Sequence, residues 1–208
     1  MHAPSNCHAL LLKCAAACPT GSAKRWQDAV AHALHVPHTL QTAFTPKAEN
    51  GLPMQHVYLR FSKPTDIQEN DCASFEKIWL TLTGLAAQVS RLQEVMHLNG
   101  PYSDTPMGVH YVVETDPEEG WAPEIFKWYD EEHMPGLARV PGCVVARRYL
   151  NLDHRPRSFA CYDLHNPEVL STAPWLAVRG SAWSDVCRPH FTNTLRTMFH
   201  TTELFPHD

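Results

Sequence analysis

Residues 128–149 read WYDEEHMPGLARVPGCVVARRY, and this stretch decides the fold. It starts in a helical pattern, and Pro135 and Gly136 together form the signal that ends a helix. VPG at 140–142 is a turn, and the β-branched run that follows at 143–150 is typical of a strand. The stretch therefore predicts a helix, a tight turn and a strand, with three acids and a histidine gathered where the helix ends.

The chain contains two copies of the pattern around this stretch. Four matches occur in the same order: HALLLKC (8–14) with HYVVETD (110–116), Trp26 with Trp128, HVPHTLQTAF (35–44) with RVPGCVVARR (139–148), and QHVYLRFSKPTDI (55–67) with SFACYDLHNPEVL (158–170). Each copy reads strand, helix, strand, strand, helix, which is the split βαβ or ferredoxin-like arrangement. We expect a first repeat at 1–98, a linker rich in Gly and Pro at 99–106, and a second repeat at 107–208.

The predicted strands are apolar on both faces, and this determines how the repeats are expected to pack. In 109–113, Val109, Tyr111 and Val113 point one way, and His110 and Val112 point the other. A strand that is apolar on both faces needs cover on both. The sequence therefore predicts an α+β protein in which two tandem ferredoxin-like repeats pack sheet to sheet and close a barrel.

Composition excludes several classes of partner. The net charge is −5 and the longest arginine cluster is the RRY at 147–149, so neither nucleic acid nor an anionic membrane is an expected partner. Seven cysteines without a CxxC pair indicate a reduced, cytoplasmic protein. The apolar run at 7–18 has no preceding Lys or Arg and is interrupted by Lys13, which argues against a signal peptide.

The stretch at 128–149 resembles the signature of the EthD-like branch of the dimeric α+β barrel superfamily: an acid-His-x-Pro segment ending a helix, a VPG turn and a strand containing arginine. The resemblance covers residues 107–190 and is weaker in the first copy. Relatives usually form the barrel from two chains, so this chain resembles a fused dimer. The superfamily includes polyketide cyclases, muconolactone isomerases, cofactor-free monooxygenases and haem-degrading enzymes, so the fold alone does not name the chemistry.

His133 is the main candidate for catalysis. It lies on the same helical face as Tyr129, whereas Lys127 and Glu131 face solvent. A carboxylate from Asp130 or Glu132 is expected to orient the imidazole and raise its pKa, leaving a general acid or base near neutrality.

Two observations bear on this assignment from opposite sides. The first copy, WQDAVAHALHVP (26–37), is two residues shorter than 128–141 and lacks EEHMPG, which favours a site in the second copy only. The alternative is structural, because a histidine in the last turn of a helix can cap free carbonyl groups.

Further candidates lie on neighbouring elements. His110 is a second proton carrier if its strand face lines a cavity, and a satisfied core histidine otherwise. The expected ligand-binding residues are Tyr129, Trp128, Arg147, Glu114 and Tyr162. Arg147 could hold a carboxylate, the alternative being an exposed arginine at a strand end.

No metal or cofactor motif is present: HExxH, HxH, GxGxxG and P-loop patterns are all missing from the sequence. We therefore expect no metal and no cofactor, the alternative being haem on His133 or His110 by analogy with the superfamily.

The expected function is cofactor-independent acid–base chemistry on a small aromatic, lactone or polyketide-like molecule, as in a cyclase, isomerase, dehydratase or related lyase. The alternatives are a non-catalytic small-molecule binding protein and a structural or oligomerisation barrel. A homodimer of the fused barrel is compatible with the sequence.

Overall fold

The computed structural model describes residues 6–45 and 51–206. The first half of the chain forms, in order, β1 (Asn6–Cys14), α1 (Ser22–Leu34), β2 (His38–Thr45), β3 (Met54–Asp66), α2 (Glu69–Thr83) and β4 (Gln88–Asn99). The second half forms β5 (Val109–Pro117), α3 (Ala122–Trp128), the π-helical turn η1 (Tyr129–His133), α4 (Met134–Ala138), β6 (Cys143–Asn151), β7 (Ser158–Leu164), the 3₁₀ turn η2 (Pro167–Ser171), α5 (Ala173–Arg179), α6 (Ala182–Cys187), the 3₁₀ turn η3 (Arg188–His190) and β8 (Phe191–Pro206). These elements include the strands predicted near 110–116, 143–150 and 158–164.

The strands of the described residues are hydrogen-bonded in the cyclic order β1-β3-β2-β8-β5-β7-β6-β4, which closes a barrel. The α+β class and the barrel expected from the strand pattern are thus confirmed. Two compact units share the chain: one holds Met1–Glu94, Asn151–His154 and His200–Asp208, and the other holds Val95–Leu150 and Arg155–Phe199.

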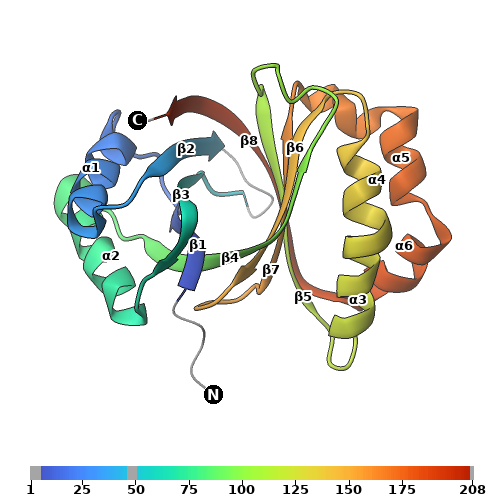
Figure 1. The fold of residues 1–208 in the computed structure, drawn as a ribbon, viewed down its shortest axis with the longest axis horizontal. Coiled ribbons are helices and arrows are strands. Elements are labelled where there is room, and N and C mark those ends of the chain that lie inside the picture. Colours follow the sequence, from blue (N-terminus) through green and yellow to red (C-terminus); the bar gives the residue numbers. More distant parts are fainter. Residues whose placement is uncertain (1–5, 46–50, 207–208) are drawn as a thin grey trace. The chain divides into compact units, whose positions relative to one another are not determined.

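In the first unit, β3 pairs antiparallel with β1 and β2, and β1 also pairs with β4. The helices α1 and α2 lie side by side against these strands (Figure 1). Trp26 of α1 is fully buried and donates its indole N–H to the carbonyl oxygen of Phe75 in α2, 3.0 Å away. Arg91 and Asp153, each 4% exposed, form a buried ion pair with an Nη2–Oδ1 distance of 2.6 Å. This unit contains an ordinary apolar core with one buried charge pair at its edge.

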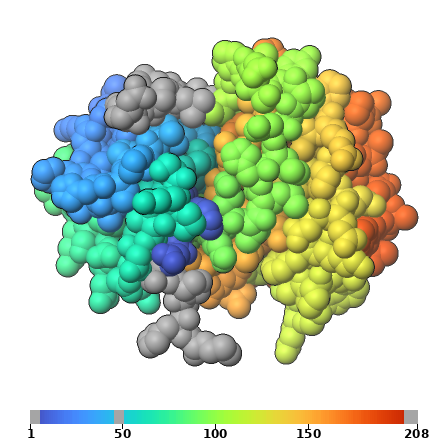
Figure 2. All heavy atoms as spheres, in the orientation of Figure 1, coloured from blue at the N-terminus to red at the C-terminus, as the bar shows by residue number. Residues whose placement is uncertain are grey.

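In the second unit, β7 pairs antiparallel with β5 and β6, and the helices cover one face of these strands (Figure 1). The core between them contains Ile125, Trp128 and Leu137 from the helical side and Ala160 and Tyr162 from β7. In the space-filling view, the helix at 122–138 (yellow) and the helices that follow β7 (orange) show no opening between them (Figure 2).

The predicted end of the helix at Pro135 and Gly136 is wrong. The helix continues to Ala138, through a π-helical turn in which the Met134 amide donates to the Tyr129 carbonyl oxygen. Gly136 has a packing role there, because an added Cβ would lie 2.9 Å from Cγ1 of Val178. Gly136 therefore does not end the helix. Because it has no side chain, α4 can approach α5 closely.

The predicted division of the chain also differs from the contacts observed. The segment expected to be a linker belongs to the second unit, where the Gly100 and Tyr102 amides donate to the carbonyl oxygens of Val144 and Cys143. An added Cβ at Gly100 would lie 2.1 Å from the Cys143 oxygen, so the chain approaches β6 too closely for any other residue. The end of β8 pairs with β2 in the first unit, although it follows the second copy in sequence.

Candidate functional site

A small cavity lies in the second unit, between the helix at 122–138 and the helix-facing side of β5 and β7. Its volume is about 30 Å³. Three kinds of residue line it: aromatic side chains (Tyr111, Trp128, Tyr129, Tyr162, Trp175, Phe191), three arginines (Arg179, Arg188, Arg196), and His133 with the small apolar residues Val113, Leu137 and Ala160. The lining is therefore aromatic and cationic.

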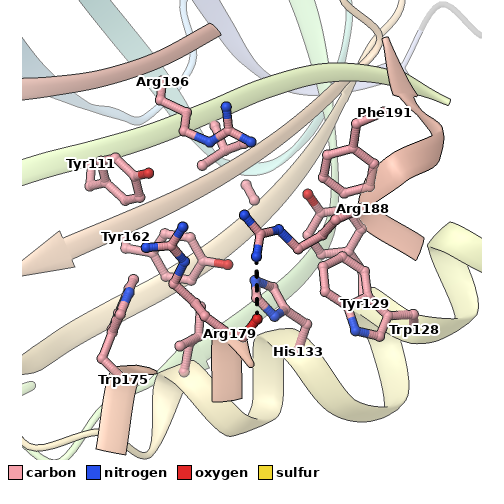
Figure 3. Close-up of a pocket in the computed structure, with 13 residues that line it drawn as sticks. Tyr111, Trp128, Tyr129, His133, Tyr162, Trp175, Arg179, Arg188, Phe191 and Arg196 are labelled. Carbon is pink, nitrogen blue, oxygen red and sulfur yellow. Dashed lines mark hydrogen bonds between the residues drawn. The ribbon is translucent and has the colours of Figure 1, made fainter. Parts of the chain in front are cut away.

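The arginines come from the end of α5, from η3 and from β8, and their guanidinium groups gather around the space beside His133 (Figure 3). Arg188 donates from Nη1 to the backbone oxygen of Arg179 at 3.4 Å. Within the described part of the chain, neither Arg179 nor Arg188 pairs with a carboxylate, and no acidic residue lines the cavity. Arg179 and Arg188 therefore offer positive charge to a ligand in the cavity.

His133 enters this cavity from the π-helical turn, and its side chain is held by aromatic rings. The imidazole stacks on the Trp128 ring at a centroid distance of 4.1 Å and meets the Tyr129 ring edge-on at 5.7 Å. His133 is only 9% exposed, and its Nδ1 is buried without a hydrogen-bond partner. The cap alternative requires a bond from the imidazole to a carbonyl at the helix end, and no such bond is present among the described residues.

The expectation of a raised pKa for His133 is wrong. Burial, together with the positive charges of Arg188 and Arg179, lowers the pKa of His133 from 6.5 to about 3. The two carboxylates expected to raise it are engaged elsewhere. Asp130 is half exposed and pairs with Arg148 at 3.2 Å, and Glu132 accepts a hydrogen bond from the Ser181 hydroxyl at 2.5 Å.

Two of the tyrosines in the cavity are strong candidates for hydrogen-bond donors. Burial raises the pKa of Tyr129 and of Tyr162 above the usual value for a phenol, so both hydroxyl groups stay protonated. The Tyr162 hydroxyl donates to the sulfur of Met134 at 3.0 Å, which is a weak acceptor. A ligand oxygen would be a better partner for it.

His110 and Arg147 form a second cluster, on the face of the strands that points away from the cavity. Nδ1 of His110 lies 2.6 Å from Oδ1 of Asp163, and Nη1 of Arg147 lies 2.7 Å from Oδ2 of the same carboxylate. Glu114 shares the face of β5 with His110 and is also buried. Two of the predicted site residues, His110 and Arg147, are thus assembled around Asp163, and not around His133.

Among the predicted residues, His133, Tyr129, Trp128 and Tyr162 come together at one cavity, whereas Asp130 and Glu132 do not line it. Sequence reasoning missed the three arginines. Arg179, Arg188 and Arg196 lie nine and eight residues apart in segments without a motif, so the sequence contained no signal for their convergence.

Comparisons with known proteins address the fold. No family model and no curated protein matches the chain. Among solved structures, similarity extends over nearly the whole chain to a candidate monooxygenase from Lactobacillus acidophilus NCFM (TM-score 0.60, 11% identity, 97% of this chain and 96% of that one). An anthrone oxidase-like protein aligns with TM-score 0.54 and 10% identity over 95% and 92% of the two chains.

A chlorite dismutase variant from Candidatus Nitrospira defluvii aligns with TM-score 0.54 and 10% identity over 93% and 91% of the two chains. These similarities show that the chain shares the overall fold of these three proteins. At such identities they show nothing further about this chain.

The cavity of about 30 Å³ beside His133 is smaller than the roughly 300–1,000 Å³ of sites that enclose a cofactor. Over residues 6–45 and 51–206 there is no cluster of three or more His, Cys, Asp or Glu side chains arranged to hold a metal ion. None of the helices described is long and apolar enough to cross a bilayer.

Proposed function

We propose that the chain is a cofactor-independent acid–base enzyme, and that its substrate is a small aromatic, lactone or polyketide-like molecule that bears or develops a negative charge. The observation that supports this best is the pairing of a neutral imidazole with three arginines in one aromatic cavity. Removing a proton next to a carbonyl group produces an oxyanion, and preorganised cations are the groups that stabilise it.

His133 is the base in this proposal. Its lowered pKa keeps the imidazole neutral at all pH values above about 4, so a nitrogen lone pair is available to accept a proton. Nδ1 has no protein partner that would compete for that role. Arg188 and Arg179 hold the oxygen on which negative charge develops, and the Tyr162 hydroxyl donates a further hydrogen bond.

Binding of an anion would also make His133 a stronger base. Part of the lowering of its pKa comes from Arg188 and Arg179. A negative ligand between these residues offsets their charge and raises the pKa of the imidazole toward neutrality, where proton transfer is most effective. The same charge that holds the substrate would therefore activate the base.

The product depends on what the oxyanion does next. Return of the proton to another carbon gives isomerisation, attack of the enolate carbon on a second carbonyl gives cyclisation, and loss of a neighbouring hydroxyl group gives dehydration. All of these reactions use the same first step, so the cavity supports the reaction class without selecting one member.

The size of the cavity limits how a substrate enters. About 30 Å³ accommodates an anionic head group but not an aromatic ring. The arginine side chains are half-buried, and rotation about their bonds would admit the rest of the molecule between the aromatic rings. A non-catalytic carrier would share the arginines, but it has no use for an unpartnered imidazole nitrogen.

We also propose that the chain is a tandem duplication within the EthD-like branch, with a single site. The order of strand, helix, strand, strand, helix and strand in both halves supports the duplication. The helix α1 runs from Ser22 to Leu34 without a π-helical turn, and it lacks the segment that positions His133.

Ligand binding by variants of the cavity tests the proposal. We expect 1-naphthoate to bind and its neutral analogue 1-naphthalenemethanol to bind at least about tenfold more weakly, because hydrogen bonds to charged groups are the stronger ones. Arg188→Gln should weaken naphthoate binding about tenfold or more, whereas Arg139→Gln, at an exposed position outside the cavity, should leave it unchanged. Equal binding of acid and alcohol, or equal effects of the two substitutions, would refute the proposal.

A further inference from the structure

Three side chains of the second unit, Glu118, Trp121 and His190, form a cluster outside the cavity that we call the His190 cluster. Nδ1 of His190 lies 2.6 Å from Oε2 of Glu118. The His190 ring stacks face to face on the Trp121 ring, at a centroid distance of 3.3 Å and an interplanar angle of 8°. The Glu118 amide also donates to the His190 carbonyl oxygen at 2.9 Å. These contacts join the segment before α3 to the turn η3.

The His190 cluster connects two segments that build the cavity. Trp121 directly precedes α3, and the helix continues from there into the π-helical turn that contains His133. His190 is the last residue of η3, whereas Arg188 is its first residue and Phe191 follows it. Arg188 and Phe191 both line the cavity (Figure 3). A shift of η3 relative to α3 would therefore move the Arg188 side chain relative to His133.

The position of the Arg188 side chain depends mainly on the backbone of η3. Its bond from Nη1 to the backbone oxygen of Arg179 measures 3.4 Å, which is longer than the usual range of about 2.7–3.2 Å for N–H···O bonds. The turn is short, and Cys187 anchors it at one end because this side chain is fully buried. The His190 cluster anchors the other end.

The strength of this second anchor depends on protonation. Histidine is the side chain whose charge changes between pH 5 and 8. Glu118 is the charged group that the segment before α3 presents to His190, Trp121 is uncharged, and Arg188 is the charged residue of the same turn. A protonated imidazole forms an ion pair with the carboxylate and a cation–π contact with the indole, whereas a neutral imidazole retains only an ordinary hydrogen bond.

We propose that His190 regulates anion binding in the cavity, because its protonation fixes η3 and thereby holds Arg188 in place beside His133. This inference rests on the proposed function, since the ligand it concerns is the anionic ligand of that cavity. A ligand that needs one arrangement of the site binds more tightly when that arrangement is more populated. The pair is partly exposed, with 29% for His190 and 53% for Glu118, so we expect a gain in affinity of about three- to fivefold at low pH.

Calorimetric titration with 1-naphthoate at pH 7.5 and 5.5 tests the proposal, because this ligand is a carboxylate at both pH values. Glu118→Gln keeps an acceptor for the neutral imidazole but removes the charge. It should bind as the unmodified protein does at pH 7.5 and lose the gain of about three- to fivefold at pH 5.5. Glu124→Gln is the matched control, since Glu124 accepts a bond from the Trp183 indole at 2.7 Å and an indole does not titrate. Any effect of pH through His133 is common to all three proteins.

The proposal is overturned if Glu118→Gln keeps the full gain at pH 5.5, or if Glu124→Gln loses as much of it. A measurement without ligand separates this proposal from the proposed function. In the ¹³C-labelled full chain, the Cζ resonance of Arg188 should shift between pH 7.5 and 5.5, and this shift should be lost in Glu118→Gln. If naphthoate does not bind, the proposed function fails, and the Arg188 resonance alone then decides whether His190 controls this side chain. Equal shifts in the two proteins would overturn that control.

Discussion

The burial of a neutral imidazole at His133 predicts how stability depends on pH. In the unfolded chain this histidine titrates near 6.5, and in the folded protein burial and two arginines lower its pKa to about 3. Between these values the unfolded state binds a proton that the folded state does not, so the free energy of unfolding falls as the pH falls. Relative to pH 7.5, the linkage relation gives a loss of about 1 kcal/mol at pH 5.5 and about 3 kcal/mol at pH 4.5.

Comparison with His133→Gln isolates this contribution, because all other titrating groups are common to both proteins. Urea unfolding of each protein at pH 7.5, 5.5 and 4.5 gives the difference in stability at each pH. We expect the unmodified protein to lose about 3 kcal/mol relative to His133→Gln between pH 7.5 and 4.5. A difference that stays constant with pH would mean that His133 can be protonated in the folded protein, and the argument for a neutral base would fail.

Two predictions concern the framework of the fold. Asp153→Ala should destabilise the fold by about 3 kcal/mol or more in urea unfolding, because it leaves the Arg91 guanidinium buried without its partner. Asp28→Asn removes an ion pair with Lys24 at the surface, and should change the free energy of unfolding by less than about 0.5 kcal/mol. Similar losses for Asp153→Ala and Asp28→Asn would contradict the view that the buried pair matters more than the surface pair. Gly108→Ala should cost about 1–3 kcal/mol, since the new Cβ would lie 2.3 Å from the His165 oxygen, and an unchanged urea midpoint would rule out this close contact.

The features that depend on local periodicity could be predicted from the sequence. The stripe that places Tyr129 and His133 inward and Lys127 and Glu131 outward is the one observed, because helical spacing alone determines which face is buried. The alternation of side chains along β5 likewise predicted that Tyr111 and His110 lie on opposite faces. In the structure Tyr111 lines the cavity, whereas His110 lies opposite Asp163 on the other face.

Features that depend on contacts between residues distant in sequence could not be predicted from periodicity. Gly136 was expected to end a helix, but its role is set by Val178 of another helix. The pKa of His133 was expected to rise because Asp130 and Glu132 are close to it in sequence, yet these carboxylates bond to Arg148 and Ser181. Arg188 approaches His133 only through the folding of the chain after β7, so the sign of the pKa shift followed from tertiary structure.

The segment after β7 shows most clearly where periodicity fails. Instead of the single helix expected to end the second copy, the chain after β7 forms short helices and 3₁₀ turns. The structure places Arg179 and Arg188 at the end of one such helix and in the last turn, where both side chains reach the cavity. In a single continuous helix, the helical spacing would have determined the directions of these two arginine side chains. Because the chain forms separate short helices instead, the cationic cavity could not be predicted from the sequence.

The most direct test of the proposed chemistry is exchange of α-protons for solvent deuterium in an enolisable aromatic acid such as 2-acetylbenzoate, followed by NMR in D₂O. This measurement detects the first proton transfer without requiring the natural substrate. We expect the protein to accelerate exchange and His133→Gln to lose roughly 10²–10⁴-fold of that acceleration while remaining folded. If His133→Gln exchanges as fast as the unmodified protein, or if neither accelerates exchange in a panel of such ketones that bind the cavity, His133 is not the base and the acid–base account is contradicted.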